Sequence, residues 1–144
     1  MNTIFDQYLN RILTEEFDVA IKSAVGIVQD HDRWLLGLST AKDDRKNKWV
    51  FPGGHLKRGE DSGRAAAREV KEETGVRCRA HGEAIILPDR KGVAFYHCKV
   101  TSVDQQLDPN SEFSAVGFFT TREMQSLKLY DNVKKLIDRV KRRC

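Results

Sequence analysis

One segment in the middle of the chain most constrains how it folds. Residues 51–76 read FPGGHLKRGEDSGRAAAREVKEETGV. The Pro-Gly-Gly run at 52–54 breaks regular strand pairing and lets the backbone turn sharply. Asp61 is a good N-cap, and Gly75 fits the C′ position that ends a helix. The segment therefore predicts a loop followed by a helix over about 62–74.

The predicted helix places three carboxylates on one face. Glu69, Glu72 and Glu73 follow i, i+3, i+4 spacing. Like charges at this spacing destabilise a helix by several tenths of a kcal/mol per pair, and anions in the last turn oppose its dipole by about 0.3–1 kcal/mol each. The total of ~1–3 kcal/mol is a noticeable share of a small domain's stability, so a compensating interaction is expected.

Two explanations account for the carboxylates. Arg64, Arg68 and Lys71 could pair with them on a solvated face, although exposed ion pairs contribute little. Alternatively, a divalent cation binds among them. A carboxylate cluster without nitrogen or sulfur ligands favours Mg²⁺ or Mn²⁺ over zinc, and Mg²⁺ commonly completes its shell with water and substrate phosphates.

The whole segment resembles the Nudix box. Gly54 is followed after five residues by Glu60, and after seven more by the run REVKEETGV at 68–76. So many defined positions at set spacings make the match specific, unlike a lone glycine motif. The stretches WVFPGG before the box and EFSAVGFFTTREM after it also look like Nudix flanks. The chain is thus identified as a member of the Nudix hydrolase family.

The resemblance implies a fold and a reaction. The expected fold is of the α+β class, an α/β/α sandwich with a mixed sheet between helices. The expected reaction is cleavage of a nucleoside diphosphate linked to another group X, in which water attacks phosphorus while metal ions neutralise the diphosphate charge. Mg²⁺ is the implied cofactor, with Mn²⁺ as a substitute.

The resemblance also assigns roles within the box. Glu69, Glu72 and Glu73 would be metal ligands, with Glu69 also orienting or deprotonating the water, and the backbone carbonyl of Gly53 would be a further ligand. Supporting roles fall to neighbouring residues, which set the orientation of the ligands. Arg68 would hold a box glutamate, Glu60 would steady the loop and helix by hydrogen bonding, and the box glycines Gly54 and Gly75 would shape the backbone.

Glu112 is a candidate outside the box. In the family, a glutamate in the loop before the last strand often adds a metal ligand or acts as the base, and Glu112 stands at the corresponding distance before Phe118. A solvated loop glutamate is the alternative. Phe113 occupies a place where relatives often carry a polar residue, so the assignment of the base stays open.

The substrate is less constrained than the reaction. Asn132 stands where nucleotide-sanitising relatives use an asparagine to read an oxidised purine, although it also fits a helix cap. His55, inside the box, is the histidine expected near the site. Arg45 and Lys48, together with Lys46 in the loop before Trp49, could reach phosphates or simply be solvated. The remaining candidates, aromatic residues that could stack a base, are more often core residues: Trp34, Trp49 and Phe51.

Known substrate signatures do not fit well. Pro88 lies closer to the box than the proline of relatives that prefer ADP-ribose, and Tyr96 lies further along than the tyrosine of those acting on dinucleoside polyphosphates. Sanitation of (d)NTPs is therefore placed ahead of ADP-ribose or nucleotide-sugar cleavage. Removal of 5′ pyrophosphate from RNA is a further alternative, and a nucleotide sensor without turnover is the alternative outside enzymes. A sensor would not need the whole carboxylate set.

The other elements follow from hydrophobic periodicity. Apolar residues at helical spacing predict an amphipathic helix over about 3–15, which could cover the domain or a second copy of the chain in a homodimer. The remaining expected strands are 18–29 and 34–40 as a hairpin, 49–51, 76–88 and 92–102 joined by a turn, and 114–120. Closing helices are expected at 121–127 and 131–143, and the sheet should have helices on both faces.

Composition sets the broad class. The chain has 144 residues, 40% hydrophobic and 32% charged, which fits one domain over 1–144 with a helical extension at 1–17. No apolar run reaches membrane-spanning length, and the first residues do not read as a signal peptide, so a cytoplasmic location and no membrane partner are expected. The cysteines, three in number and without C-x-x-C spacing, are expected to be reduced thiols.

The net charge of +4 is unevenly distributed. The chain ends in the basic stretch KKLIDRVKRRC. Such a stretch suits nucleic acid or phosphate, but a solvated helix whose dipole favours cations at its C-terminal end is the preferred interpretation. RNA is therefore retained as a partner, beside a small nucleotide substrate.

Overall fold

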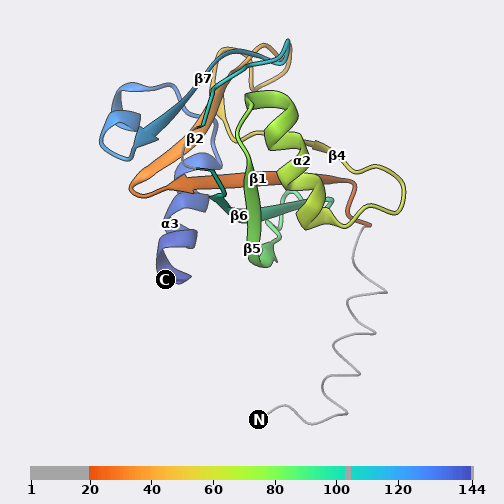
Figure 1. Cartoon of the computed structure of the whole chain (residues 1–144). Coiled ribbons are helices and arrows are strands. Elements are labelled where there is room, and N and C mark those ends of the chain that lie inside the picture. Colours follow the sequence, from red (N-terminus) through yellow and green to blue (C-terminus); the bar gives the residue numbers. More distant parts are fainter. Residues whose placement is uncertain (1–19, 103–104, 144) are drawn as a thin grey trace.

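A mixed sheet lies between two helices in the computed structural model, which describes residues 20–102 and 105–143 (Figure 1). The sheet of these residues has seven strands: β1 (Ser23–Asp30), β2 (Arg33–Ser39), β3 (Trp49–Val50), β4 (Gly53–His55), β5 (Cys78–Ile85), β6 (Val93–Val100) and β7 (Phe113–Thr120). The helices are α2 (Ser62–Thr74), the 3₁₀ helix η1 (Glu123–Ser126) and α3 (Val133–Arg143). The predicted sandwich with a mixed sheet is confirmed.

Strands β1 and β6 form a parallel pair, called the parallel seam, in the middle of the sheet. The order is β3-β2-β1-β6-β5, with β4 pairing β1 and β7 pairing β2. β1 and β6 run parallel over seven pairs, from Ser23–Val93 to Gln29–Lys99, while the other pairings are antiparallel. On its other edge, β1 pairs β4 at its start and β2 at its end. This divided edge brings the Pro-Gly-Gly segment against the middle of the sheet.

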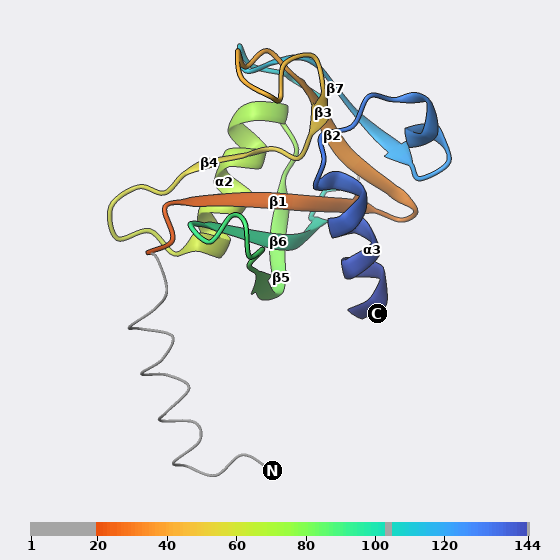
Figure 2. The same cartoon turned by 180° about the vertical axis from the view of Figure 1, so that it is seen from behind.

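The helices cover opposite faces of the sheet (Figures 1 and 2). Neighbouring residues of a strand point to opposite faces, so Ile27 belongs to the core under α3 and Val28 to the core under α2. Val70 of α2 packs in the second core, and Gly26 lets the helix approach, since a Cβ there would lie 2.6 Å from a Val70 methyl. Four apolar residues of α3 are buried: Val133, Leu136, Ile137 and Val140.

The ends of α2 match the sequence prediction. A side-chain oxygen of Asp61 accepts the N–H of Arg64 at 3.1 Å. At the other end Gly75 has φ +83°, which favours glycine, and its N–H donates to the Lys71 carbonyl. Both signals are local in sequence, which is why they fix the helix so closely.

Two expectations are wrong, and a third concerns residues outside the described structure. Gly53 and Gly54 do not stop strand pairing, because they lie in β4 and pair with Val25 and Ala24 of β1. Residues 121–127 form only the short η1 instead of a full helix. The predicted helix at 3–15 lies outside the described residues. Within the described part of the chain, no helix is long and apolar enough to cross a membrane.

Candidate active site

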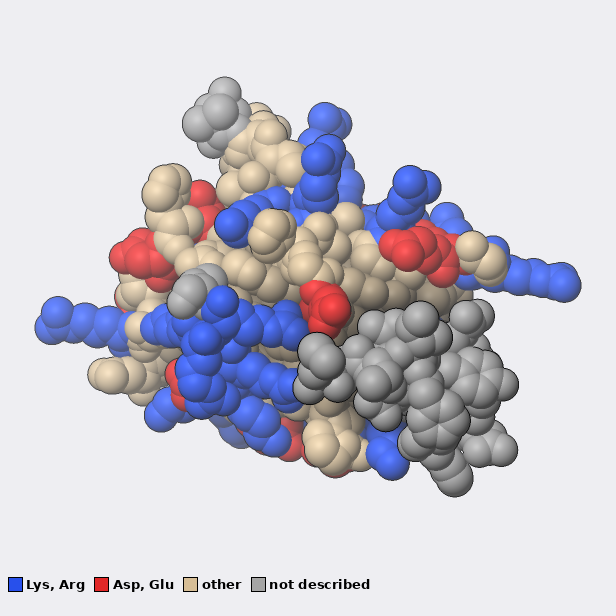
Figure 3. Space-filling model, turned by 90° about the horizontal axis from the view of Figure 1, so that it is seen from below, with Lys and Arg blue, Asp and Glu red and all other residues tan. Residues whose placement is uncertain are grey.

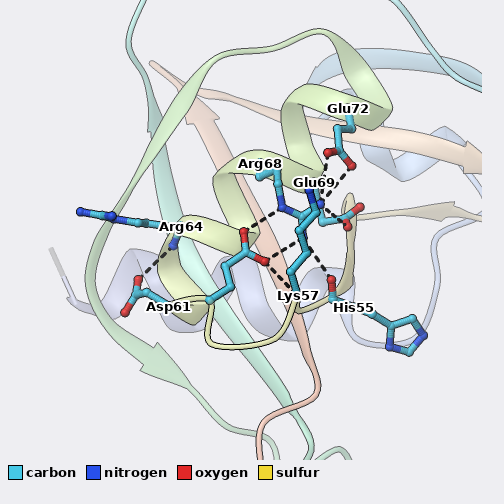
Figure 4. A network of polar contacts seen from close by, with 8 residues as sticks. His55, Lys57, Asp61, Arg64, Arg68, Glu69 and Glu72 are labelled. Carbon is cyan, nitrogen blue, oxygen red and sulfur yellow. Dashed lines mark hydrogen bonds and ion pairs between the residues drawn. The ribbon is translucent and has the colours of Figure 1, made fainter.

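Arg68 of α2 is the centre of a polar network (Figure 4). Its Nε and Nη2 donate to the two carboxylate oxygens of Glu60 at 2.8 and 2.9 Å. Its Nη1 donates to Glu69 at 2.9 Å and to Glu72 at 3.1 Å, and its Nη2 also donates to the His55 carbonyl at 3.1 Å. One guanidinium therefore ties the loop before α2, strand β4 and two box glutamates together.

Glu60 closes the loop that leads into α2. Besides binding Arg68, it accepts the backbone N–H of Lys57 at 2.9 Å. The hydrogen bonds from Arg68 and Lys57 hold the pKa of Glu60 at about 2, and the bonds with Glu60, Glu72 and Glu69 raise the pKa of Arg68. A planar guanidinium meets a carboxylate with two parallel bonds, which gives this pair geometric specificity.

Glu73 is a buried carboxyl in the last turn of α2. Its side chain is 2% exposed, and its Oε1 has no hydrogen-bond partner in the described structure. Burial raises the pKa of Glu73 to about 9, and the rise is increased by hydrogen bonding to Glu69 and by the charges of Glu112 and Glu69. A hydrogen bond with the backbone of Gly53 acts in the opposite direction. The carboxyl groups of Glu69 and Glu112 thus come close enough to Glu73, beside β4, to act on its pKa.

Two glycines allow this close approach. A Cβ on Gly54 would lie 2.6 Å from the carboxylate carbon of Glu69, so a larger residue there would displace the Glu69 carboxylate. A Cβ on Gly75 would lie 2.5 Å from the Gln106 carbonyl oxygen. The first glycine brings β4 against the box glutamates, and the second brings the loop before β7 against the end of α2.

The loop before β7 is hydrogen-bonded to that helix end. The N–H of Asp108 donates to the Thr74 carbonyl at 2.8 Å, and the N–H of Asn110 donates to the Glu73 carbonyl at 3.2 Å. The side chain of Asn110 accepts the N–H of Glu112 at 2.9 Å, and Thr40 donates its N–H to the Glu112 carbonyl at 3.1 Å. The backbone of Glu112 is therefore held on both sides, with its carboxylate close enough to raise the pKa of Glu73.

Phe113 belongs to the core and not to the site. Its side chain is buried, and a Cβ on Gly37 would lie 2.5 Å from its ring. The apolar residue beside Glu112 thus anchors β7 against β2. This explains why the position is aromatic here and leaves Glu112 as the acidic side chain of that loop whose charge acts on Glu73.

The residues fit a divalent metal by their chemistry. Within 20–102 and 105–143, no three His, Cys, Asp or Glu side chains are already arranged to hold a metal ion. The carboxylates of Glu69 and Glu72 both accept hydrogen bonds from Arg68 in this structure. Two observations nevertheless favour a metal. The buried Oε1 of Glu73 has no hydrogen-bond partner in the described structure. The available donors are carboxylates, the ligands that Mg²⁺ and Mn²⁺ prefer.

A pocket of about 320 Å³ adjoins the box glycines. Its lining includes three of the predicted substrate residues, Arg45, His55 and Asn132, and also Gly53 and Gly54. The remaining lining residues are Ser23, Val25, Val50, Phe51, Arg90, Val93, Phe95 and Tyr130. The pocket therefore combines apolar walls with a few polar groups, as small-molecule sites do.

The predicted residues hold different positions around this pocket. Asn132 is buried, while the guanidinium of Arg45 is paired with Asp43 at 2.6 Å. Lys48 does not line the pocket, and its Nζ lies 5.9 Å from the centre of the Tyr130 ring. Of the aromatic candidates, Phe51 borders the pocket, whereas Trp34 is core and Trp49 packs edge-on against Phe119 at 4.9 Å.

Arg90 and Tyr130 are pocket residues that sequence analysis did not find. Arg90 donates to the Tyr130 hydroxyl and to Asp131, and its guanidinium lies 4.8 Å from the centre of the Tyr130 ring. The Tyr130 hydroxyl donates to Asp44 at 3.0 Å. The Arg90 Nε is buried without a hydrogen-bond partner in the described structure. An arginine in a turn has no positional signal in the sequence, because its partners lie some forty residues away.

Comparison with known proteins defines the class. Residues 20–140 match the family model described as NUDIX domain. This chain belongs to the Nudix family. A Caenorhabditis elegans protein named as a nudix hydrolase is 31% identical over 104 residues, which cover 70% of this chain and 28% of that protein. The chain thus spans less than a third of the length of this relative.

Solved structures share the fold at low sequence identity. A bifunctional NMN adenylyltransferase/ADP ribose pyrophosphatase from Francisella tularensis, complexed with AMP and a Mn ion, is 17% identical with a TM-score of 0.70, covering 96% of this chain and 46% of that one. A C. elegans Ap4A hydrolase in a binary complex is 21% identical with a TM-score of 0.65, covering 83% and 96%. These likenesses establish the fold alone.

Proposed function

We propose that the protein is a metal-dependent pyrophosphohydrolase that cleaves a nucleoside diphosphate linked to another group X. The observation that carries this proposal is the buried Glu73, which meets Glu69 and Glu112 and keeps one carboxylate oxygen without a partner. A buried carboxyl beside other acids is unfavourable unless it is protonated or binds a cation. Family membership supplies the reaction class to which this arrangement is suited.

The proposed roles follow the positions of the residues. Glu69, Glu72 and Glu73 would hold Mg²⁺ or Mn²⁺ with the Gly53 carbonyl, and the bound metal would neutralise charge on the diphosphate. Glu69 or Glu112 would orient the water and accept its proton. Arg68 would fix Glu69 and Glu72 in place, and Glu60 would fix Arg68.

A mononucleotide is the favoured substrate, most simply a (d)NTP or related nucleotide. The pocket volume of about 320 Å³ lies at the lower end of the range for ligand sites, which favours one nucleoside over two. Asn132 and Arg90 in its wall offer hydrogen bonds to a base edge or a sugar. Phe51 and Phe95 offer apolar contact.

ADP-ribose or a nucleotide sugar is the second candidate. The F. tularensis neighbour is named as an ADP ribose pyrophosphatase and the C. elegans neighbour as an Ap4A hydrolase, so structures of this fold act on several nucleotide classes. Removal of 5′ pyrophosphate from RNA is a third candidate. A cytoplasmic location and a homodimer formed through the N-terminal helix stay predictions.

A substrate panel tests the proposal. Nucleoside triphosphates with normal and oxidised bases, ADP-ribose, nucleotide sugars, diadenosine polyphosphates and triphosphorylated RNA are incubated with Mg²⁺ or Mn²⁺, and the products are identified. We expect hydrolysis between phosphorus atoms, lost with a chelator and restored by excess metal. Tight nucleotide binding without any turnover across the panel would instead identify a sensor.

A further inference from the structure

We propose that α3 and the adjoining ends of β5 and β6 form a second binding surface, which takes the phosphate backbone of a nucleic-acid strand. The surface, called the α3 basic surface, consists of exposed lysines and arginines: Lys134, Lys135, Arg139, Lys141, Arg142 and Arg143 of α3, Arg79 of β5 and Lys99 of β6. None of them lines the pocket beside the box. The proposal does not depend on the proposed hydrolase activity.

The exposed side of α3 is almost entirely cationic. Six of its eleven residues are lysine or arginine, and Asp138 is its one acidic residue. The apolar residues of the helix are buried against the sheet, so the charges point outward. Figure 3 shows the basic side chains gathered on this side of the molecule, on the left where α3 lies in Figure 1.

Contacts between α3 and the β5–β6 pair make the surface continuous. Nη1 of Arg143 donates to the Glu83 carbonyl of β5 at 3.0 Å. Burial lowers the pKa of His97 in β6, and the charges of Lys99, His81 and Arg143 lower it further, so these groups act at one place. Residues far apart in the sequence therefore share one positive field.

The charges on this surface are not neutralised within the described chain. None of the eight side chains forms an ion pair with a carboxylate of residues 20–102 or 105–143. Arg79 and Lys99 are register partners on the antiparallel strands β5 and β6, where like charges directly opposite each other are destabilising. A bound polyanion would remove this repulsion.

The shape favours nucleic acid over a membrane. A helix that binds a membrane inserts an apolar face, but the apolar face of α3 is buried in the core. The large apolar side chains exposed in the described structure are Ile86 and Leu107, neither of them on α3. Eleven residues of helix span about 16 Å, which corresponds to roughly five phosphates of one strand. No exposed aromatic side chain of α3 offers base stacking, so backbone binding without sequence preference is expected.

The test measures binding without catalysis. A fluorescent single-stranded RNA with a 5′-hydroxyl end is titrated with the full chain in EDTA, and anisotropy is followed from 50 to 300 mM salt. Four to six contacts predict a log–log slope of about −3 to −4. The double variant Arg139→Glu/Arg142→Glu should bind at least tenfold more weakly and with a shallower slope. A single-stranded DNA arm should behave alike.

A matched control separates the surface from net charge. Arg64→Glu/Arg77→Glu makes the same charge change on exposed residues outside the α3 basic surface. On a logarithmic scale, its loss of affinity should be less than about half the loss of the α3 variant. Arg139→Gln/Arg142→Gln is a milder second variant, and an unchanged far-ultraviolet circular dichroism spectrum and thermal midpoint report that each variant is folded. The proposal would be overturned if both charge-reversal variants lost RNA affinity equally, or if no RNA bound at 50 mM salt. Binding to phosphatidylserine vesicles but not to RNA or DNA would also overturn it.

Discussion

The two ends of the candidate active site present opposite unpaired groups. In the described structure, the buried side-chain nitrogen and oxygen atoms without a partner are Oε1 of Glu73 and Nε of Arg90. The first lies among carboxyl groups, where a cation is favourable. The second lies in the pocket wall, where an acceptor is favourable. A molecule with a metal-bound diphosphate at one end and an acceptor on a base or sugar at the other would satisfy both, which is the bipartite chemistry of a nucleotide.

The two groups differ in how they are held. In the metal-free protein Glu73 is protonated at neutral pH, because burial raises its pKa to about 9. Arg90 keeps its charge, supported by Tyr130 and Asp131. The carboxyl end should therefore determine the rate and respond to pH and metal, and the pocket end should determine affinity and substrate choice.

The largest effect is expected from Glu73→Gln. Loss of a ligand that contributes several kcal/mol to charge stabilisation should lower Mg²⁺-dependent kcat/KM by at least about 100-fold. Folding should persist, because an amide avoids the cost of burying a charge. Steady-state kinetics and circular dichroism measure the two quantities. Retained full activity would remove Glu73 from the metal site.

Arg68→Ala should have the next largest effect. Its guanidinium orients Glu69 and Glu72, and loss of such an orienting partner typically weakens metal affinity or activity by about 10- to 100-fold. Arg68→Lys should not restore activity, since lysine lacks the planar fork that binds Glu60. Mn²⁺ affinity measured by electron paramagnetic resonance tests this directly, and a lysine variant equal to wild type would contradict it.

Arg90→Met should change affinity more than rate. Loss of the proposed hydrogen bond from Arg90 to the substrate should raise KM by about tenfold, the equivalent of a hydrogen bond to a charged group, while kcat falls less. Asp131→Asn, outside the pocket lining, is the control, because it weakens only one partner of Arg90. A change confined to kcat would place Arg90 in the chemical step instead.

Asn110→Ala should have a smaller effect on activity. Its side chain holds the N–H of Glu112, and loss of that single hydrogen bond is worth about 1 kcal/mol, or roughly a fivefold fall in kcat. Asn110→Asp keeps the acceptor oxygen and should recover most of the loss. Equal activity of Asn110→Ala and wild type would show that the loop holds Glu112 without this bond.

A last effect concerns the stability of the metal-free protein and not its activity. The folded pKa of Glu73 lies above its unfolded value of 4.5, so the folded state binds the proton more tightly. Stability contributed by this group is complete below pH ~4.5 and is lost as pH rises toward ~9. We expect Tm to fall by about 10 °C or more over that range relative to Glu73→Gln, measured by calorimetry in a chelator. A parallel pH profile for both proteins would contradict the shift.

The comparison also separates what the sequence could predict from what it could not. The box helix was predicted to its end residues, because Asp61 and Gly75 act on backbone groups nearby in the chain. β4 was missed, because its pairing with β1 brings together residues some thirty positions apart and glycine normally weakens a strand. Arg90 and Tyr130 were missed for the same reason, since their contact joins two loops that only the folded sheet brings together.

The parallel seam has a consequence for the order of assembly. Ser23 pairs Val93 and Gln29 pairs Lys99, so the central strand finds its partner only after about seventy further residues have been made. Parallel pairings at such separation form slowly, because the entropy of closing the long loop is lost before the contacts between the strands can stabilise the structure. During synthesis, β6 therefore becomes available to pair with β1 only after β1, β2 and the box helix have all been made. We expect amide protons along the seam to become protected last in refolding, although they lie nearest the middle of the finished sheet.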